Sequence, residues 1–175
     1  VIVPQKCYIF PPVLIDYLND HGVTALVWAT SAFHLVANSG VLEKKVPEKV
    51  RVIALGGEAL RAKQLNIWRR AMPGTSYINL YGPTEVTVDC TAYKIDREFK
   101  DDEAIPIGTA CRNMEVILLK EDLTPAFPGE KGEICVRGRG LANGYFGDDE
   151  KTGSAFIQNP LNKNYRDTVY RTGDI

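Results

Sequence analysis

The chain has 175 residues, of which 45% are hydrophobic and 25% are charged, and its formal net charge is −1. This composition fits one globular domain and argues against a nucleic-acid-binding surface, which needs a basic excess. No apolar run approaches the roughly 20 residues that a bilayer requires, so we expect no membrane partner. The cysteines form no C-x-x-C pair and favour buried thiols and a cytoplasmic compartment: Cys7, Cys90, Cys111 and Cys135.

The first half of the chain alternates helical and extended patterns. Three helices are expected, from Pro11-Pro12 to the C-cap Gly22, from the cap Ser31 to Val36, and from Leu60 to Met72. Short apolar runs between them predict strands at 23–28, 50–55 and 77–80. Strands that alternate with helices favour a parallel sheet with helical cover, that is, an α/β fold.

The second half begins with a different pattern. Apolar and polar residues alternate from Val86 to Tyr93, which is typical of a half-buried strand. Two more strands are expected, at 114–119 and 133–136, with a Pro-Gly turn at 128–132. We therefore predict an α/β portion in residues 1–85 and a small, mostly antiparallel sheet or distorted barrel in residues 86–175.

Both ends of the chain resemble interrupted elements. Val1-Ile2-Val3 has the pattern of a strand already under way, and Thr172-Gly173-Asp174-Ile175 is a turn signal before another strand. We therefore expect the chain to be an internal piece of a longer domain.

Two strand ends carry residues suited to a ligand, and ligands of α/β sheets bind beyond the carboxyl ends of strands. Gly56-Gly57-Glu58 follows the second strand, but alone it favours a tight turn with Glu58 near a helix N-terminus. The segment Tyr81-Gly82-Pro83-Thr84-Glu85 follows the third strand. It joins an aromatic face, a phosphate-binding hydroxyl and a carboxylate for Mg²⁺ on one stiff turn. The competing interpretation is a Pro-Gly turn with Thr84 as helix cap.

The segment Asn79–Glu85 resembles the central motif of the adenylate-forming superfamily. That group includes nonribosomal peptide synthetase adenylation domains, D-alanine–carrier protein ligases, acyl-CoA synthetases and luciferases. Further segments resemble family motifs in the family's order: Gly56–Glu58, Ile105–Gly108 with Asn113, Gly132–Gly138 with Leu141–Tyr145, and Tyr170–Asp174. The resemblance implies that the chain is part of the large N-terminal domain of an adenylating enzyme.

The resemblance implies a nucleotide site that holds ATP with Mg²⁺. The backbone of Gly56-Gly57-Glu58 would flank the adenine, Asn79 would bond its amino group, and Tyr81 would stack on the ring. After the bend at Gly82, Thr84 would contact the α-phosphate.

Two carboxylates complete the expected site. Glu85 would bind Mg²⁺, so that Thr84 and Glu85 are the expected catalytic residues. Asp174 would accept both ribose hydroxyls through charge-assisted hydrogen bonds. The acid-binding pocket would be lined by the residues at the family's specificity positions: Val27, Ala54, Gly56, Leu80, Val88 and Asp89.

The implied function is ATP-dependent activation of an amino acid, or another small carboxylic acid, as its acyl-adenylate. The acyl group would then pass to the phosphopantetheine thiol of a carrier protein. An acyl- or aryl-CoA synthetase, with coenzyme A as acceptor, is the alternative enzyme. The family's phosphate loop and catalytic lysine have no match in these residues. A non-catalytic nucleotide-binding piece is therefore a further alternative, and the isolated chain is expected to be inactive.

Overall fold

The computed structural model describes residues 2–175 and divides the chain into two compact units. The first unit holds the residues up to Tyr81 together with Ala92–Gly108, and the second holds Gly82–Thr91 together with Thr109–Ile175. The expected division of one domain into residues 1–85 and 86–175 stays a prediction. Across residues 2–175, every helix falls short of the length and apolar character that a membrane crossing requires.

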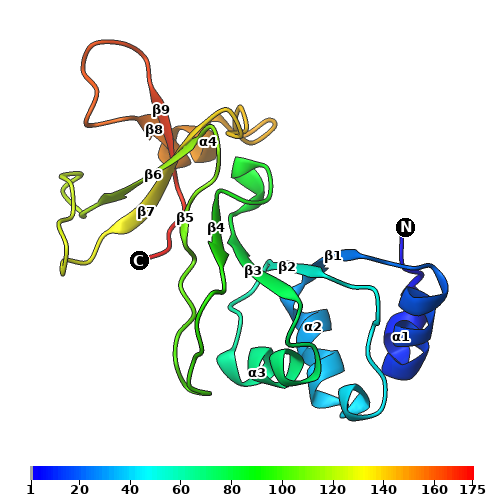
Figure 1. Ribbon diagram of the computed structural model, residues 1–175. Helices are drawn as coiled ribbons and strands as arrows, with labels where there is room; N and C mark the ends of the chain where they lie inside the picture. The colour runs from blue at the N-terminus through cyan, green and yellow to red at the C-terminus, as the bar shows by residue number, and fades with distance from the viewer. Residues whose placement is uncertain (1) are drawn as a thin grey trace. The chain divides into compact units, whose positions relative to one another are not determined.

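The first unit is built on a β-sheet whose first three strands are parallel (Figure 1). In spatial order these are β1 (Ala25–Ala29), β2 (Val52–Gly56), β3 (Ser76–Tyr81) and β4 (Thr91–Lys94). The pairs β1–β2 and β2–β3 are parallel, with Val27 beside Ala54 and Ala54 beside Ile78. The predicted parallel α/β layer is therefore confirmed.

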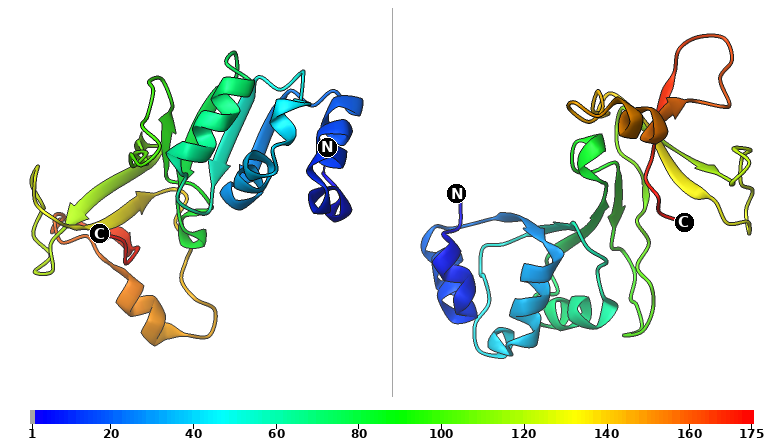
Figure 2. Two further views of the ribbon diagram at one scale, coloured as in Figure 1. Left: turned by 90° about the horizontal axis from the view of Figure 1, so that it is seen from below. Right: turned by 180° about the vertical axis from the view of Figure 1, so that it is seen from behind.

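Helices cover one face of this sheet, and Figure 2 shows α2 and α3 on the same side of the strands. The helical segments of the unit are η1 (Gln5–Ile9), α1 (Pro11–Asp20), α2 (Thr30–Asn38), η2 (Val41–Glu43) and α3 (Ala62–Ala71). Aromatic side chains join the two layers. Trp68 of α3 stacks on Phe33 of α2 with 4.9 Å between ring centroids and meets the edge of Trp28 of β1 at 6.2 Å. Trp68 also donates its indole hydrogen to the Phe33 carbonyl at 3.1 Å, so the large buried ring leaves no unpaired donor.

The sequence signals predicted helix ends better than helix starts. Gly22, with φ +58°, lies two residues after α1, and α3 ends just before Pro73, as expected. Ser31 is not a cap, because α2 already begins at Thr30 and no side chain caps it. The strand expected at the start of the chain is wrong for Ile2 and Val3, which precede the helical turn η1, and Val1 lies outside the described residues.

The second unit contains an antiparallel sheet in the order β6-β7-β9-β8. Its elements are η3 (Thr84–Val86), β5 (Thr109–Ala110), β6 (Met114–Leu119), β7 (Glu133–Gly138), α4 (Asp149–Ala155), β8 (Phe156–Gln158) and β9 (Thr168–Arg171). This confirms the predicted small antiparallel sheet. The helix α4 was not expected, because its seven residues carry no apolar stripe. The Asp148 side chain caps it by accepting a hydrogen bond from the Lys151 amide at 2.8 Å.

The strand predicted from Val86 to Tyr93 is wrong over most of its length. Val86 ends η3, and the next two residues, Thr87 and Val88, have left-handed φ angles of 61° and 75°. Regular pairing starts only at Thr91. The alternation fails at Val88, which is 66% exposed although the pattern predicted a buried side chain.

Candidate active site

The four pocket residues of the first unit share one face of its sheet. Trp28 and Leu55 are buried on the helical side, and side chains alternate along a strand, so Val27, Ala54 and Gly56 face the opposite side. The parallel register places Val27 beside Ala54. Val27 is 80% exposed there.

Leu80 joins these residues by the same geometry. Its neighbour Asn79 pairs in register with Leu55, which belongs to the helical side, so Leu80 faces the side of Val27 and Ala54. Val27, Ala54, Gly56 and Leu80 thus come from three neighbouring parallel strands and make a small, apolar surface that runs from the middle of β1 and β2 to the carboxyl ends of β2 and β3.

The loop after β2 is open to a ligand. Gly57 has φ +92°, and no heavy atom lies within 4 Å of where a Cβ would stand, so its backbone is accessible from that side. Glu58 is exposed. The interpretation of Glu58 as a helix N-terminal carboxylate is wrong, because α3 begins four residues later and has no acidic residue in its first turn.

Asn79 is held on the helical side of the sheet. It is 5% exposed, and its Nδ2 donates to the Pro106 carbonyl at 2.9 Å, which leaves Oδ1 as the atom able to accept from an adenine amino group. The nearby Gly108 has φ +90°, and a Cβ there would stand 2.0 Å from the Ala92 carbonyl oxygen. The Pro-Ile-Gly segment is therefore fixed by a backbone crossing that admits no side chain. Tyr81, the last residue of β3, is half-buried.

The second unit opens with a tightly crossed loop. A Cβ on Gly82 would meet the carbonyl oxygen of Val88 at 2.5 Å, and backbone atoms of Asp89 and Cys90 at 2.7 Å. Thr87 and Val88 are β-branched residues in the left-handed region, which is a strained conformation of a kind that gathers at functional sites. Asp89 is half-buried, and this burial raises the pKa of its carboxyl group.

Thr84 does not serve as a helix cap. It is the first residue of η3, the cap position is Pro83, and no side chain makes a capping hydrogen bond. The Thr84 side chain is exposed. Two hydrogen bonds tie this turn to the glycine-rich segment: the Ala142 amide donates to the Glu85 carbonyl at 2.8 Å, and the Thr87 hydroxyl donates to the Gly140 carbonyl at 2.6 Å.

The carboxylate of Glu85 lies against two tyrosines. The Tyr145 hydroxyl donates to Oε1 of Glu85 at 2.6 Å, and the Tyr170 hydroxyl lies 3.5 Å from that of Tyr145. The hydrogen bond from Tyr145 lowers the pKa of Glu85, because it stabilises the charged form. Within residues 2–175 no cluster of three or more His, Cys, Asp or Glu side chains could hold a metal ion. A single carboxylate still suits Mg²⁺, which takes one or two protein carboxylates together with nucleotide phosphates.

The turn that carries Asp174 is fastened to the start of β7. The Thr172 hydroxyl donates to the Ile134 carbonyl at 2.8 Å, and the Gly173 amide donates to Oε1 of Glu133 at 2.9 Å. Oε2 of Glu133 accepts two hydrogen bonds from the Arg171 guanidinium, at 2.9 and 2.6 Å. Asp174 itself is exposed, with its amide donating to the Thr172 hydroxyl at 3.1 Å.

The predicted residues thus fall into one group in each unit. Gly56, Gly57, Glu58, Asn79, Tyr81 and three pocket residues belong to the first, and Gly82, Thr84, Glu85, Val88, Asp89 and Asp174 belong to the second. Their assembly into one nucleotide site stays a prediction. Sequence reasoning placed Tyr145 and Glu133 in motifs but gave them no role. A role for them could have been inferred from their chemistry, because a half-buried tyrosine or carboxylate in a glycine-rich segment needs a hydrogen-bond partner.

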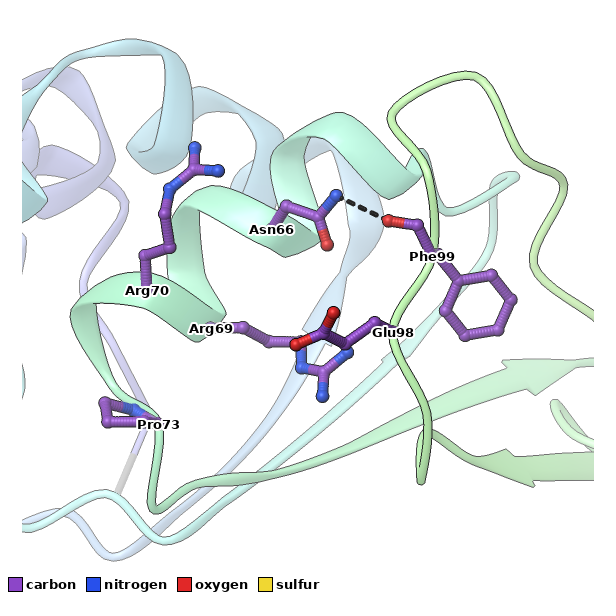
Figure 3. A pocket seen from close by; sticks show the side chains of 6 residues that line it. All are labelled: Asn66, Arg69, Arg70, Pro73, Glu98 and Phe99. Atoms are coloured by element: carbon purple, nitrogen blue, oxygen red, sulfur yellow. Dashed lines mark hydrogen bonds between the residues drawn. The ribbon is translucent and has the colours of Figure 1, made fainter.

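A separate hollow of about 410 Å³ in the first unit contains none of the predicted site residues. Figure 3 shows it between the C-terminal part of α3 and the segment after β4, with Asn66 bonded to the Phe99 carbonyl at 2.9 Å. Its two arginines, Arg69 and Arg70, lie in the last turn of α3, where cations interact favourably with the helix dipole.

Comparison with known proteins finds one matching family and several similar peptide synthases. The family model described as AMP-binding enzyme matches residues 1–146. Surfactin synthase subunit 2 of Bacillus subtilis (strain 168) is 32% identical over 99% of this chain, which corresponds to 5% of that protein. Gramicidin S synthase 2 of Brevibacillus brevis is 36% identical over 91% of this chain and 3% of its own length.

Solved structures show the same fold. PA1221, described as an NRPS protein containing adenylation and PCP domains, superposes with a TM-score of 0.81 at 30% identity. The match covers 93% of this chain and 32% of that one. CmiS6 superposes with a TM-score of 0.87 at 27% identity, over 98% of this chain and 41% of its own. The chain therefore spans a small part of the curated synthases and less than half of the solved chains.

Proposed function

The chain belongs to the AMP-binding enzyme family, and from that premise we propose that it works as part of an ATP-dependent ligase that activates an amino acid as its aminoacyl-adenylate. The observation that carries the proposal is the family match over residues 1–146, which includes the segment from Tyr81 to Glu85. The synthase relatives and the adenylation-domain structure support an amino acid as the substrate. The apolar surface around Val27 and Ala54 would receive its side chain.

In the proposed reaction the substrate carboxylate attacks the α-phosphorus of ATP, and pyrophosphate leaves. The protein contributes mainly by aligning the reactants and by offsetting the developing charge. Glu85 would hold Mg²⁺, which supplies charge neutralisation at the leaving group. Thr84 would contact the α-phosphate, Tyr81 would stack on the adenine, and Asp174 would bind both ribose hydroxyls.

The acceptor that we propose is the phosphopantetheine thiol of a carrier protein. Support comes from PA1221, whose description joins adenylation and PCP domains in one protein. We also propose a cytoplasmic location, which fits cysteines that form no disulfide within residues 2–175.

The experiment is amino-acid-dependent ATP–pyrophosphate exchange by the protein that carries these residues, with two variants. Asp174→Ala should weaken ATP binding at least tenfold, since hydrogen bonds to charged groups contribute about 1.5–3 kcal/mol each. Glu85→Gln keeps the shape and removes the charge, so it should lower the exchange rate more than it weakens AMP binding. Equal losses of rate and of AMP binding in Glu85→Gln would remove the metal role from Glu85. Absence of exchange with every amino acid, alongside activity with another acid, would refute the substrate class.

A further inference from the structure

The side chains around Glu85 form a compact group within the second unit. Tyr145 approaches from the glycine-rich segment, and Tyr170 comes from β9. The Tyr145 hydroxyl donates to Oε1 of Glu85 at 2.6 Å, a short distance typical of a hydrogen bond to a carboxylate. A carboxylate offers about four lone-pair positions, so one donated bond fixes its direction and leaves acceptor capacity for a cation.

Tyr145 is itself held rigidly. Its amide donates to the Thr152 hydroxyl at 2.8 Å, and that hydroxyl donates to the Asp148 carbonyl at 2.7 Å, which ties the residue to the first turn of α4. The preceding residue, Gly144, has φ +134°, and a Cβ there would stand 2.5 Å from a methyl carbon of Thr152. The backbone at Gly144 thus lies close to the Thr152 side chain of α4.

The ring of Tyr145 has two contacts with neighbouring side chains. The Lys151 ammonium lies 3.9 Å from its centroid, and the Phe156 ring meets it edge-on with 5.9 Å between centroids. These contacts involve the ring and not the hydroxyl. Exchange of Tyr145 for phenylalanine therefore removes the bond to Glu85 and keeps the packing.

We propose that Tyr145 is a positioning residue that orients the Glu85 carboxylate for the Mg²⁺ that accompanies the nucleotide. The inference rests on the proposed function, in which Glu85 holds that ion. Partners of this kind, which hold a metal ligand and not the metal, typically change metal affinity by roughly 10- to 100-fold when they are lost. The hydroxyl of Tyr170 lies 3.5 Å from that of Tyr145, and we expect it to contribute less than the bond that Tyr145 donates at 2.6 Å.

The test uses Tyr145→Phe in the protein that carries these residues, with two readouts. The first is binding of Mn²⁺ in the presence of a non-hydrolysable ATP analogue, followed by the loss of the free-ion paramagnetic resonance signal. The second is the Mg²⁺ concentration that gives half-maximal ATP–pyrophosphate exchange. We expect both to weaken roughly tenfold or more, while KM for the amino acid stays within about twofold.

Tyr93→Phe is the matched control, because it removes a hydroxyl that lies 3.3 Å from the surface carboxylate of Asp96. It should change neither readout. Glu85→Gln separates the metal role of Glu85 from the positioning role of Tyr145. If Glu85→Gln leaves the metal dependence unchanged, the metal role of Glu85 is refuted. If Glu85→Gln weakens metal binding and Tyr145→Phe does not, the positioning role alone is overturned. It is also overturned if Tyr145→Phe raises KM for the amino acid and the metal requirement together, because that is the pattern of general structural damage.

Discussion

Replacement of Gly82 by alanine tests the crossed loop on which the motif Tyr81–Glu85 is built. The added methyl group would stand 2.5 Å from the Val88 carbonyl oxygen and 2.7 Å from backbone atoms of the next two residues. All three obstacles are main-chain atoms, so no side-chain rotation can relieve the overlap. Val88 already has φ 75°, which leaves that segment little freedom to move away.

The expected cost follows from these contacts. Insertion of a methyl group into a closely packed site typically costs about 1–3 kcal/mol. Since three backbone contacts fall below 3.0 Å, we expect the upper part of this range, about 2–3 kcal/mol. For a chain of this size, such a loss lowers the unfolding temperature by roughly 4–12 °C.

The assay is urea unfolding of the chain, with the free energy taken from the midpoint at constant m-value. Gly153→Ala is the matched control, because Gly153 lies in α4 of the same unit and no heavy atom stands within 4 Å of its added methyl group. Alanine in a helix stabilises by about 0.8–1 kcal/mol relative to glycine, so the two variants should differ in sign. A change of less than about 0.5 kcal/mol in Gly82→Ala would refute the crossing as the reason for a glycine at this position.

Two further predictions concern carboxylates that hold the second unit together. Glu133→Gln should destabilise the chain by about 1–2 kcal/mol in the same urea assay, because it weakens the two hydrogen bonds that Arg171 donates to Glu133. Full stability in this variant would contradict the role of that contact. Burial alone would raise the pKa of Asp167, but hydrogen bonds from Asn159 and Asn162 and the charge of Arg137 together outweigh it, so the pKa is lowered. Its contribution is therefore complete above the unfolded pKa of about 3.9 and is lost as the pH falls through the folded value. The free energy of unfolding, measured between pH 5 and about 2, should fall less steeply with decreasing pH in Asp167→Asn than in the unaltered chain. Identical slopes of this free energy against pH would contradict a stabilising role of the Asp167 carboxylate.

The fold of the first unit could be predicted because its patterns are governed by burial. Strands β1 to β3 are short apolar runs, and the helices between them place residues such as Phe33 and Trp68 on one face. An element that is buried on one side has apolar residues at a regular spacing in its sequence, and this spacing does not depend on the loops around it. Element ends were less certain, because caps such as that of α2 depend on single residues.

The second unit was harder to predict for two physical reasons. The helix α4 is held by the cap at Asp148 and by Thr152, and has no buried residue, so it leaves no apolar period. The left-handed residues Thr87 and Val88 are β-branched, and residues of this type disfavour that conformation when they are free to choose. Only the surrounding contacts, such as the bond from Thr87 to the Gly140 carbonyl, select it.

Two pairs of motifs in the second unit gain a physical meaning that one sequence does not show, because the members of each pair contact one another. The register Cys135–Arg171 places β7 and β9 side by side, so that Glu133 meets the turn that leads to Asp174. The turn of Glu85 meets Tyr145 in the same way, 60 residues away in sequence. Segments that are far apart in the chain thus share one set of contacts, and a change in one should alter the geometry of its partner before it alters the fold.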